Sequence, residues 1–142
     1  MTVLPLPITW SDSNEEAELS TIRLVEERLH IIFPKDYLEC AIRWHGGTPS
    51  PNHVLIKAPH HIIEINYLLT FAAFDELDIL DWWNTYKVQL GERIVPIATT
   101  SENGLICFDY REGPINPTVV YWDKSSLIPV CKSFSDILIM LL

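Results

Sequence analysis

Cysteine is scarce in this sequence and is not spaced for a structural or catalytic role. The chain of 142 residues has three cysteines, far apart and without a C-x-x-C pair. Such a set indicates neither a disulfide framework nor a zinc site. We interpret Cys40, Cys107 and Cys131 as reduced structural thiols of a cytoplasmic protein.

Long hydrophobic runs are also missing. No apolar stretch reaches the roughly 18 residues that a membrane helix needs, so we expect no membrane association. The first residues contain Pro5 and Pro7 and no basic side chain, and therefore do not resemble a signal peptide.

Motifs that would indicate catalysis are absent. There is no G-x-S-x-G elbow and no glycine-rich phosphate loop. Four histidines lie in a short window, but they fit neither H-x-x-x-H nor H-E-x-x-H, and the adjacent pair would point to opposite faces of a strand. We therefore expect no metal, no cofactor and no enzymatic activity, and we favour ordinary loop and strand-edge roles for His45, His53, His60 and His61.

Basic residues are few. Ten Lys and Arg residues stand against 19 Asp and Glu residues, which gives a formal net charge of -9. An acidic surface repels nucleic acid, so nucleic-acid binding is not expected, and it attracts basic proteins. The excess lies in two stretches that lack a basic residue: Asp12, Glu15, Glu16 and Glu18 in the first, and Asp75, Glu76, Asp78 and Asp81 in the second.

Hydrophobic residues are abundant, at 48% against 20% charged residues, which is typical of a globular core. We find no internal repeat or change of composition that would divide the chain. The sequence predicts one domain over residues 1–142, with residues 1–12 as a loosely ordered N-terminal segment.

The clearest predicted helix lies in the stretch FPKDYLECAIRWHGG, residues 33–47. Pro34 suits a first helical turn, and Gly46 or Gly47 can close the helix in the left-handed conformation. Three more helices are predicted over residues 18–30, 74–87 and 133–142. The candidate caps are Ser13 or Ser20 for the first of these and Ser133 or Ser135 for the last. The apolar stripe of the helix within 33–47 consists of Tyr37, Cys40, Ala41 and Trp44.

Strands are predicted in the middle of the chain, where β-branched and aromatic residues gather between turn-like segments. Residues 46–52 are predicted to form a loop. Because the last strands follow one another with short connections, the pattern indicates an α+β domain, a mostly antiparallel sheet with helices packed against it. The predicted strands cover residues 53–58, 61–71, 93–100, 104–110, 118–124 and 127–132.

The helix predicted over 74–87 carries the most informative surface. Its apolar residues cluster on one side, Asp78 and Asp81 fall on the opposite flank, and Trp82 lies at the border. A tryptophan at the edge of an acidic face is typical of an interaction hot spot, although Trp82 can equally cover the edge of the core. The apolar side consists of Ile79, Leu80, Trp83 and Tyr86.

Two later positions also invite a functional interpretation. Trp122 and Asp123 end a predicted strand, and packing against the sheet or a helix is the favoured role for Trp122. Asp109 alternates with Leu105 and Cys107 on one face of a predicted strand. If that face is buried, a backbone turn or Arg111 must satisfy the carboxylate.

Two long runs contain motif residues in a characteristic order. LVEERLHIIFPKDYLECAIRWHGG has a helix ending in Glu-x-x-Leu, then Phe-Pro, a Tyr-bearing helix and Gly-Gly. IVPIATTSENGLICFDYREGPINPTVVYWDKSS has a P-I-A strand, a Gly-led strand with an aspartate, and a Val-x-x-Trp strand ending in an acid. Together with a terminal Ser-Phe helix they resemble the SUKH superfamily, the Smi–Knr group. The matching residues are Glu26, Leu29, Phe33, Pro34, Tyr37, Gly46, Gly47, Pro96, Ala98, Gly104, Asp109, Val119, Trp122, Asp123, Ser133 and Phe134.

The sequence departs from this pattern at two positions. His30 stands where the family often has Gly after the first helix, although His tolerates the left-handed region better than a branched residue does. His45 stands where Asn usually precedes Gly-Gly, which weakens any carry-over of a family role to that position.

The resemblance implies a SUKH fold and a binding protein, not a catalyst. Members of the superfamily look like immunity proteins that neutralise a bacterial toxin, often a nuclease. We therefore expect a cognate toxin partner with a basic C-terminal domain. The alternative is a scaffold or regulatory adaptor of the Smi–Knr type, and a hydrolase is a third possibility. The residues expected to contact the partner are Asp75, Glu76, Asp78, Asp81, Trp82, Trp122 and Asp123.

Overall fold

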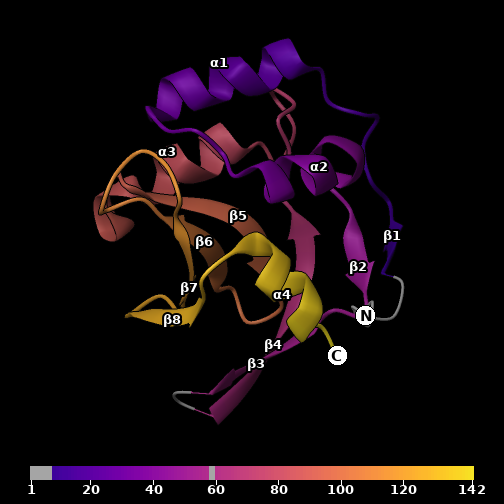
Figure 1. The fold of residues 1–142 in the computed structure, drawn as a ribbon, viewed down its shortest axis with the longest axis vertical. Coiled ribbons are helices and arrows are strands. Elements are labelled where there is room, and N and C mark those ends of the chain that lie inside the picture. The colour runs from indigo at the N-terminus through magenta and orange to yellow at the C-terminus, as the bar shows by residue number, and fades with distance from the viewer. Residues whose placement is uncertain (1–7, 58–59) are drawn as a thin grey trace, which may run out of the picture.

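The computed structural model describes residues 8–57 and 60–142. In this part of the chain, helices and strands together form an α+β fold with two separate sheets (Figure 1). The strands are β1 (Thr9–Ser11), β2 (Thr48–Ser50), β3 (His53–Lys57), β4 (His60–Leu68), β5 (Ile94–Thr100), β6 (Leu105–Asp109), β7 (Thr118–Trp122) and β8 (Leu127–Cys131). The helices are α1 (Leu19–Leu29), α2 (Lys35–Trp44), α3 (Ile79–Leu90) and α4 (Phe134–Met140).

The main sheet is antiparallel throughout and its strands lie in chain order, from β3 to β8. Short connections allow each strand to pair with the next one, which is the usual arrangement of an antiparallel meander. The predicted α+β class is thereby confirmed. The four predicted strands between residues 93 and 132 all form, each within two residues of the predicted ends.

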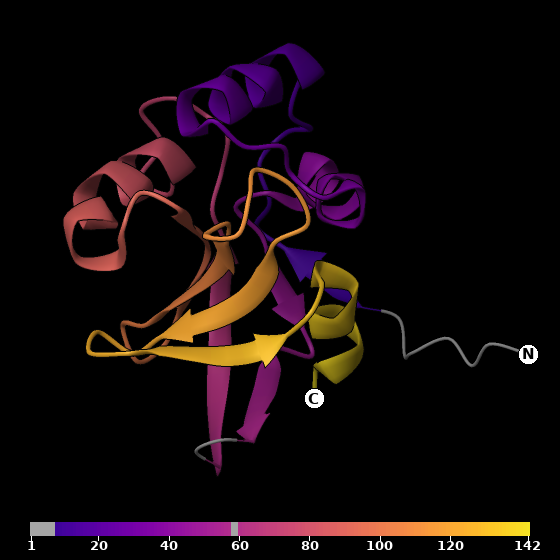
Figure 2. The same cartoon turned by 60° about the vertical axis from the view of Figure 1, so that its left-hand side comes forward.

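Side chains alternate across the sheet, so each face has its own apolar cluster. On β6, Ile106 and Phe108 face the larger core, which also contains buried residues of α1, α2 and α4. Leu105 and Cys107 face a smaller cluster that Trp82 and Tyr86 of α3 partly cover. Figure 2 shows α3 and α4 on opposite sides of the sheet.

An aromatic cluster forms the centre of the larger core. The ring of Tyr37 lies 5.1 Å from Phe33, 5.1 Å from Phe108 and 5.3 Å from Phe134, measured between centroids. The contacts with Phe108 and Phe134 are edge-to-face, the geometry that the ring quadrupole favours. The predicted apolar stripe of α2 is thus confirmed, and it anchors the helix between the sheet and α4.

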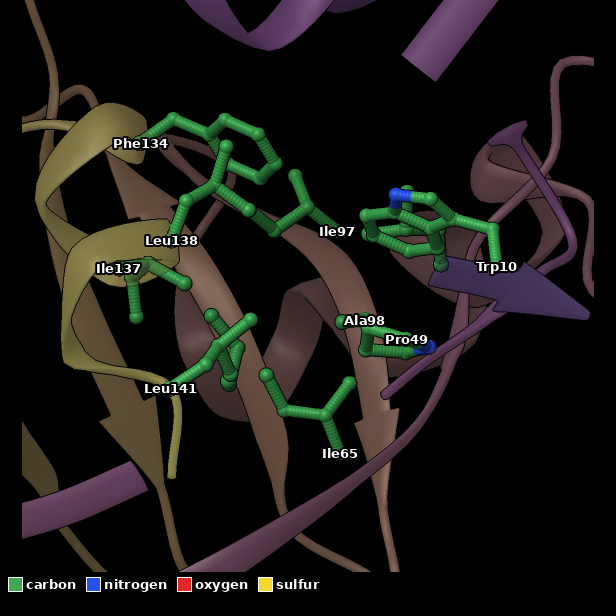
Figure 3. A pocket seen from close by; sticks show the side chains of 11 residues that line it. Trp10, Pro49, Ile65, Ile97, Ala98, Phe134, Ile137, Leu138 and Leu141 are labelled. Carbon is green, nitrogen blue, oxygen red and sulfur yellow. The ribbon is translucent and has the colours of Figure 1, made fainter. Parts of the chain in front are cut away.

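A small apolar cavity lies between α4, the sheet and the strands β1 and β2 (Figure 3). Its volume is about 10 Å³, close to the space that one water molecule needs. Because apolar side chains line it, a water molecule there would lack hydrogen-bond partners. We therefore interpret it as a packing defect. Its labelled lining includes Trp10, Pro49, Ile97, Phe134 and Leu138.

The two-stranded sheet was not predicted. Thr9–Ser11 pair with Thr48–Ser50 in segments that were expected to be a loose N-terminal segment and a loop. Residues 1–7 of that N-terminal segment lie outside the described residues. Strands of three residues give little periodicity, and Trp10 is held by stacking on Trp44, at 6.4 Å between centroids. Such a long-range contact leaves no local signal in the sequence.

Helix ends account for most of the other differences. Neither Ser13 nor Ser20 caps α1, because Glu18 occupies its N-cap position without a side-chain hydrogen bond. Ser133 caps α4 by accepting from the backbone N–H of Asp136, as one of the two alternatives predicted. The predicted strand 61–71 ends at Leu68, and α3 begins at Ile79 instead of residue 74.

Candidate protein-interaction surface

The two acidic stretches lie side by side in the fold. Asn14, inside the first stretch, donates a 3.1 Å hydrogen bond from Nδ2 to Oδ2 of Asp75 in the second. The backbone N–H of Asn14 also donates to the carbonyl of His45 at 2.9 Å. These contacts fix residues 14–18 against both α2 and the β4–α3 connection. Two clusters that are separate in the sequence therefore share one region of the surface.

His45 holds this junction together from inside. Its Nε2 lies 2.7 Å from the carbonyl oxygen of Glu15, and its Nδ1 accepts from the backbone N–H of Phe71 at 3.3 Å. Because a backbone N–H can only donate, Nδ1 is the acceptor and Nε2 carries the proton. The ring is buried, so it serves as a structural bridge between three segments.

Asp75 organises the β4–α3 connection. Its Oδ1 accepts from the backbone N–H of Leu77 at 2.9 Å, which makes an Asx turn. This bond and the one from Asn14 hold the pKa of the Asp75 carboxyl below its ordinary value. The Asp75 carboxylate thus stabilises the β4–α3 connection and also contributes negative charge to the surface.

Asp78 is placed differently from the prediction. It precedes α3 instead of lying on its flank, and its Oδ1 caps the helix by accepting from the backbone N–H of Leu80 at 3.1 Å. Only 6% of Asp78 is exposed, and this burial raises its pKa. The prediction extended the helix five residues too far toward the N-terminus, so it treated a capping residue as part of a helical face.

Trp82 covers the edge of the core, which is one of the two roles considered for it. Its ring packs at the edge of the two apolar clusters, 5.9 Å from Tyr86, and Nε1 donates to the carbonyl of Glu76 at 2.9 Å. The remaining surface of Trp82 lines a groove of about 250 Å³ together with Glu76, Asp81, Thr85 and Tyr86. Glu76 and Asp81 are exposed. The aromatic ring is therefore fixed at an acidic rim.

Trp122 and Asp123 do not line this groove. Trp122 is 4% exposed and packs edge-on against Tyr86 at 5.3 Å, which confirms its predicted packing role. Asp123 is exposed, and its Oδ1 accepts from the backbone N–H groups of Ser125 and Ser126 in the same surface turn. These bonds lower the pKa of the Asp123 carboxyl to about 2. The main structural role of Asp123 is to stabilise the β7–β8 turn.

Asp109 has the partner that the sequence predicts. Arg111 donates from Nη2 to Oδ2 of Asp109 at 2.7 Å and from its backbone N–H to Oδ1 at 2.9 Å. The guanidinium group is the largest cause of the lowered pKa of Asp109. The carboxylate is therefore satisfied within the protein.

Three adjoining grooves make the acidic region continuous. The first, of about 420 Å³, is lined by residues 14–18 and shares Thr21 and Phe71 with the second. The second, of about 400 Å³, runs along α1 and shares Asp81 with the groove beside Trp82. We call this region the acidic face. Its exposed acids are Glu15, Glu16, Glu18, Glu76 and Asp81, and Trp82 lies at its rim.

Comparison with known proteins agrees with this architecture. The model of the family described as SMI1-KNR4 cell-wall (SUKH_6) matches residues 19–138. The chain belongs to the SUKH family. Among curated proteins, none matches it. The match spans all four helices of the SUKH domain except the last residues of α4.

The motif residues of this SUKH domain maintain its internal structure. Glu26 accepts from the backbone N–H of Phe33 at 2.7 Å, and His30 ends α1 in the left-handed conformation with φ 57°. Gly46 has φ 81°, and a Cβ built on Gly104 would overlap the hydroxyl of Tyr121. The acidic face, Trp82 included, is built from other positions. The family motifs therefore account for the fold, whereas the acidic face consists of residues outside them.

His53 and His61 have separate carboxylate partners. Nε2 of His61 lies 2.9 Å from Oε2 of Glu102, and Nε2 of His53 lies 3.5 Å from Oε2 of Glu64. Among residues 8–57 and 60–142, no three His, Cys, Asp or Glu side chains are grouped as a metal ion would require. Within the same ranges, no helix has both the length and the apolarity for crossing a membrane.

Sequence reasoning missed one prominent surface residue. Phe74 was assigned to a helix, yet it lies in the β4–α3 connection and lines the second groove. Its side chain is 100% exposed. The signal in the sequence was Asp75, a residue type that favours Asx turns. Its Asx turn lies between Phe74 and α3, so Phe74 is not part of the helix.

Proposed function

We propose that this chain is an immunity protein that binds the toxin domain of a bacterial toxin system and neutralises it. The observation that carries the proposal is the union of two acidic stretches into one face with a fixed tryptophan at its rim. Membership of the SUKH family supports a binding role. The reaction chemistry, on this proposal, belongs to the partner alone.

A nuclease is the class of toxin that best fits the charge of the acidic face. A nuclease presents basic side chains to the phosphates of its substrate, and a face of opposite sign can occupy or flank that surface. Complementary charge also raises association rates, toward about 10⁸ M⁻¹s⁻¹ at low salt. Fast capture is useful to a protein that must act before the toxin reaches nucleic acid in the cytoplasm, where we place this chain.

The seven residues expected from the sequence divide into two groups on this proposal. Glu76, Asp81 and Trp82 are available for direct contact, because their exposed parts line one groove. The others hold the turns, the helix start and the aromatic packing that position this groove: Asp75, Asp78, Trp122 and Asp123.

The proposal is tested by toxicity rescue. The cognate toxin domain is produced in cells with and without the chain, and survival is measured. We expect rescue by the wild type and weaker rescue by Trp82→Ala, with Trp83→Ala as the matched control on the same helix. Cell death despite good expression of both proteins would contradict an immunity role and would favour the scaffold or adaptor alternative.

A further inference from the structure

We propose that Phe74 is the anchor of a docking site for a basic protein segment that carries an apolar side chain or recess. This inference rests on the proposed function in one respect, namely that the partner is a protein. It adds the residue around which the contact is organised and the chemistry of the segment that binds there.

Both the exposure and the backbone conformation of Phe74 are energetically unfavourable. Its ring is 100% exposed, which leaves the whole apolar surface in water. Its φ is 66°, a left-handed conformation that bulky residues rarely adopt because the Cβ approaches the following carbonyl oxygen. Such outliers persist where the surrounding structure fixes them, and they gather at ligand-binding sites.

The loop around Phe74 is held firmly. The backbone N–H of Asp75 donates to the carbonyl of Ala72, and that of Thr70 donates to the carbonyl of Leu77 at 2.8 Å. The backbone N–H of Ile79 donates to the carbonyl of Thr70, also at 2.8 Å. Asp75 adds its two side-chain contacts on the C-terminal side. The ring is therefore presented by a preorganised loop, which lowers the entropic cost of binding.

The adjoining groove supplies the rest of an interface core. It lies between α1 and the start of α3, and in Figures 1 and 2 the β4–α3 connection rises beside α1. Its apolar lining includes Val25, Leu80 and Leu24, the last of which is 62% exposed. An aromatic residue beside an apolar groove is the usual composition of a hot spot.

Charge identifies the occupant. Asp81 lies on one wall of the groove, the acids of residues 15–18 line the groove beyond Thr21 and Phe71, and Glu76 follows Phe74 by two residues. Arg28 is the one basic residue in the lining of the groove. An apolar centre with a mostly acidic border attracts a segment whose apolar group is flanked by Lys or Arg side chains.

The experiment uses a phage-displayed library of random peptides selected on the immobilised full chain. We expect enriched peptides to combine basic residues with an aromatic or aliphatic one. Their affinity should fall by about tenfold or more in Phe74→Ala, and it should be retained in Val88→Ala, which removes an apolar side chain 90% exposed on α3. Selection of acidic peptides, of peptides indifferent to Phe74, or of none would overturn the inference.

Two further measurements separate the possible explanations. A Phe74→Gly variant should lose peptide binding without a lower unfolding midpoint, because glycine adopts this φ freely; a lower midpoint would indicate a structural role and count against the inference. Sedimentation equilibrium should show no dimer that depends on Phe74, since such a dimer would assign the site to a second copy of the chain. If the chain rescues cells from the toxin but peptide binding does not depend on Phe74, this inference alone is refuted. If peptide binding depends on Phe74 but the chain gives no rescue, only the immunity role is refuted.

Discussion

Asn14 and Asp75 are joined by a 3.1 Å hydrogen bond across 61 positions of the chain, and this contact places the N-terminal acids beside those of the β4–α3 connection. Gly46 lies against the same asparagine, since a Cβ built there would come 2.5 Å from Oδ1 of Asn14. The asparagine thus connects the Gly-Gly motif to the acidic face.

Replacing Asn14 with alanine should loosen this junction. The Asn14→Ala variant loses one bond to a charged acceptor at a half-buried position, so we expect the free energy of unfolding to fall by about 1 kcal/mol. Urea denaturation monitored by tryptophan fluorescence measures the change. Asn84→Ala, on the exposed surface of α3, is the control and should unfold at the wild-type midpoint or above it.

Neutralising the acidic face should slow capture of the toxin domain. In the Glu76→Gln, Asp81→Asn double variant we expect the association rate at low salt to fall several-fold and to depend less on ionic strength, because long-range attraction is reduced. Stopped-flow mixing at several salt concentrations measures both effects. A Glu39→Gln, Glu112→Gln variant has the same net charge but leaves the grooves intact. Equal slowing by the two variants would show that net charge alone matters.

The hydroxyl of Tyr37 is a buried donor without a partner among the described residues. Burial raises the pKa of this phenol, so it stays protonated and its hydrogen-bonding capacity is unused. We expect Tyr37→Phe to raise the free energy of unfolding by about 1 kcal/mol, since an unsatisfied polar group is removed without changing the ring packing. Tyr110→Phe is the matched control. Its hydroxyl donates to the carbonyl of Ile32 at 2.9 Å, so that variant should be less stable than the wild type.

Asp123 makes the stability of the β7–β8 turn depend on pH. The pKa of its carboxyl is about 2 in the folded protein against an ordinary value of 3.8, so the ionised form is the one that stabilises the fold. Its contribution is therefore complete above about pH 4 and is lost as the pH falls through 2. We expect the stability difference between wild type and Asp123→Ala to be constant at neutral pH and to shrink over this acidic window. A difference that stayed constant down to pH 2 in urea titrations would contradict the assignment.

The three thiols should react slowly in the folded protein. Burial raises the pKa of Cys40 to about 12 and that of Cys131 to about 11, and it raises the pKa of Cys107 as well. Little thiolate is therefore present at pH 8. Alkylation with iodoacetamide, followed by mass spectrometry, should modify Cys131 first and Cys107 last, with all three reacting promptly in denaturant. Rapid modification of native Cys107 would show that the sheet opens at β6.

The sheet and its helices could be predicted because their signals are local. The runs from Ile94 to Cys131 combine β-branched residues with clear turns, and Tyr37 to Trp44 show one helical stripe. The pairing of Asp109 with Arg111 was also accessible, because Arg111 lies only two residues after Asp109, in the turn that follows β6. In each case a few consecutive residues determine the outcome.

The acidic face could be predicted only in part, because distant contacts assemble it. Two acidic stretches and Trp82 were found from the sequence, but their adjacency depends on Asn14 and His45, whose partners lie on other segments. The start of α3 depends on the Asx turn at Asp75 and the cap at Asp78, which compete with a helical pattern that could begin at residue 74. Phe74 was assigned to that helix for the same reason.

The acidic face has a further consequence because it is a discontinuous epitope. Residues 14–18 meet the β4–α3 connection and α3 only through the tertiary structure. A synthetic fragment of either stretch carries half of the charges and none of their arrangement. A single proteolytic cut between residues 14–18 and α3 that lets the two pieces separate should therefore abolish any inhibitory activity of this surface. This holds even if both pieces stay in solution.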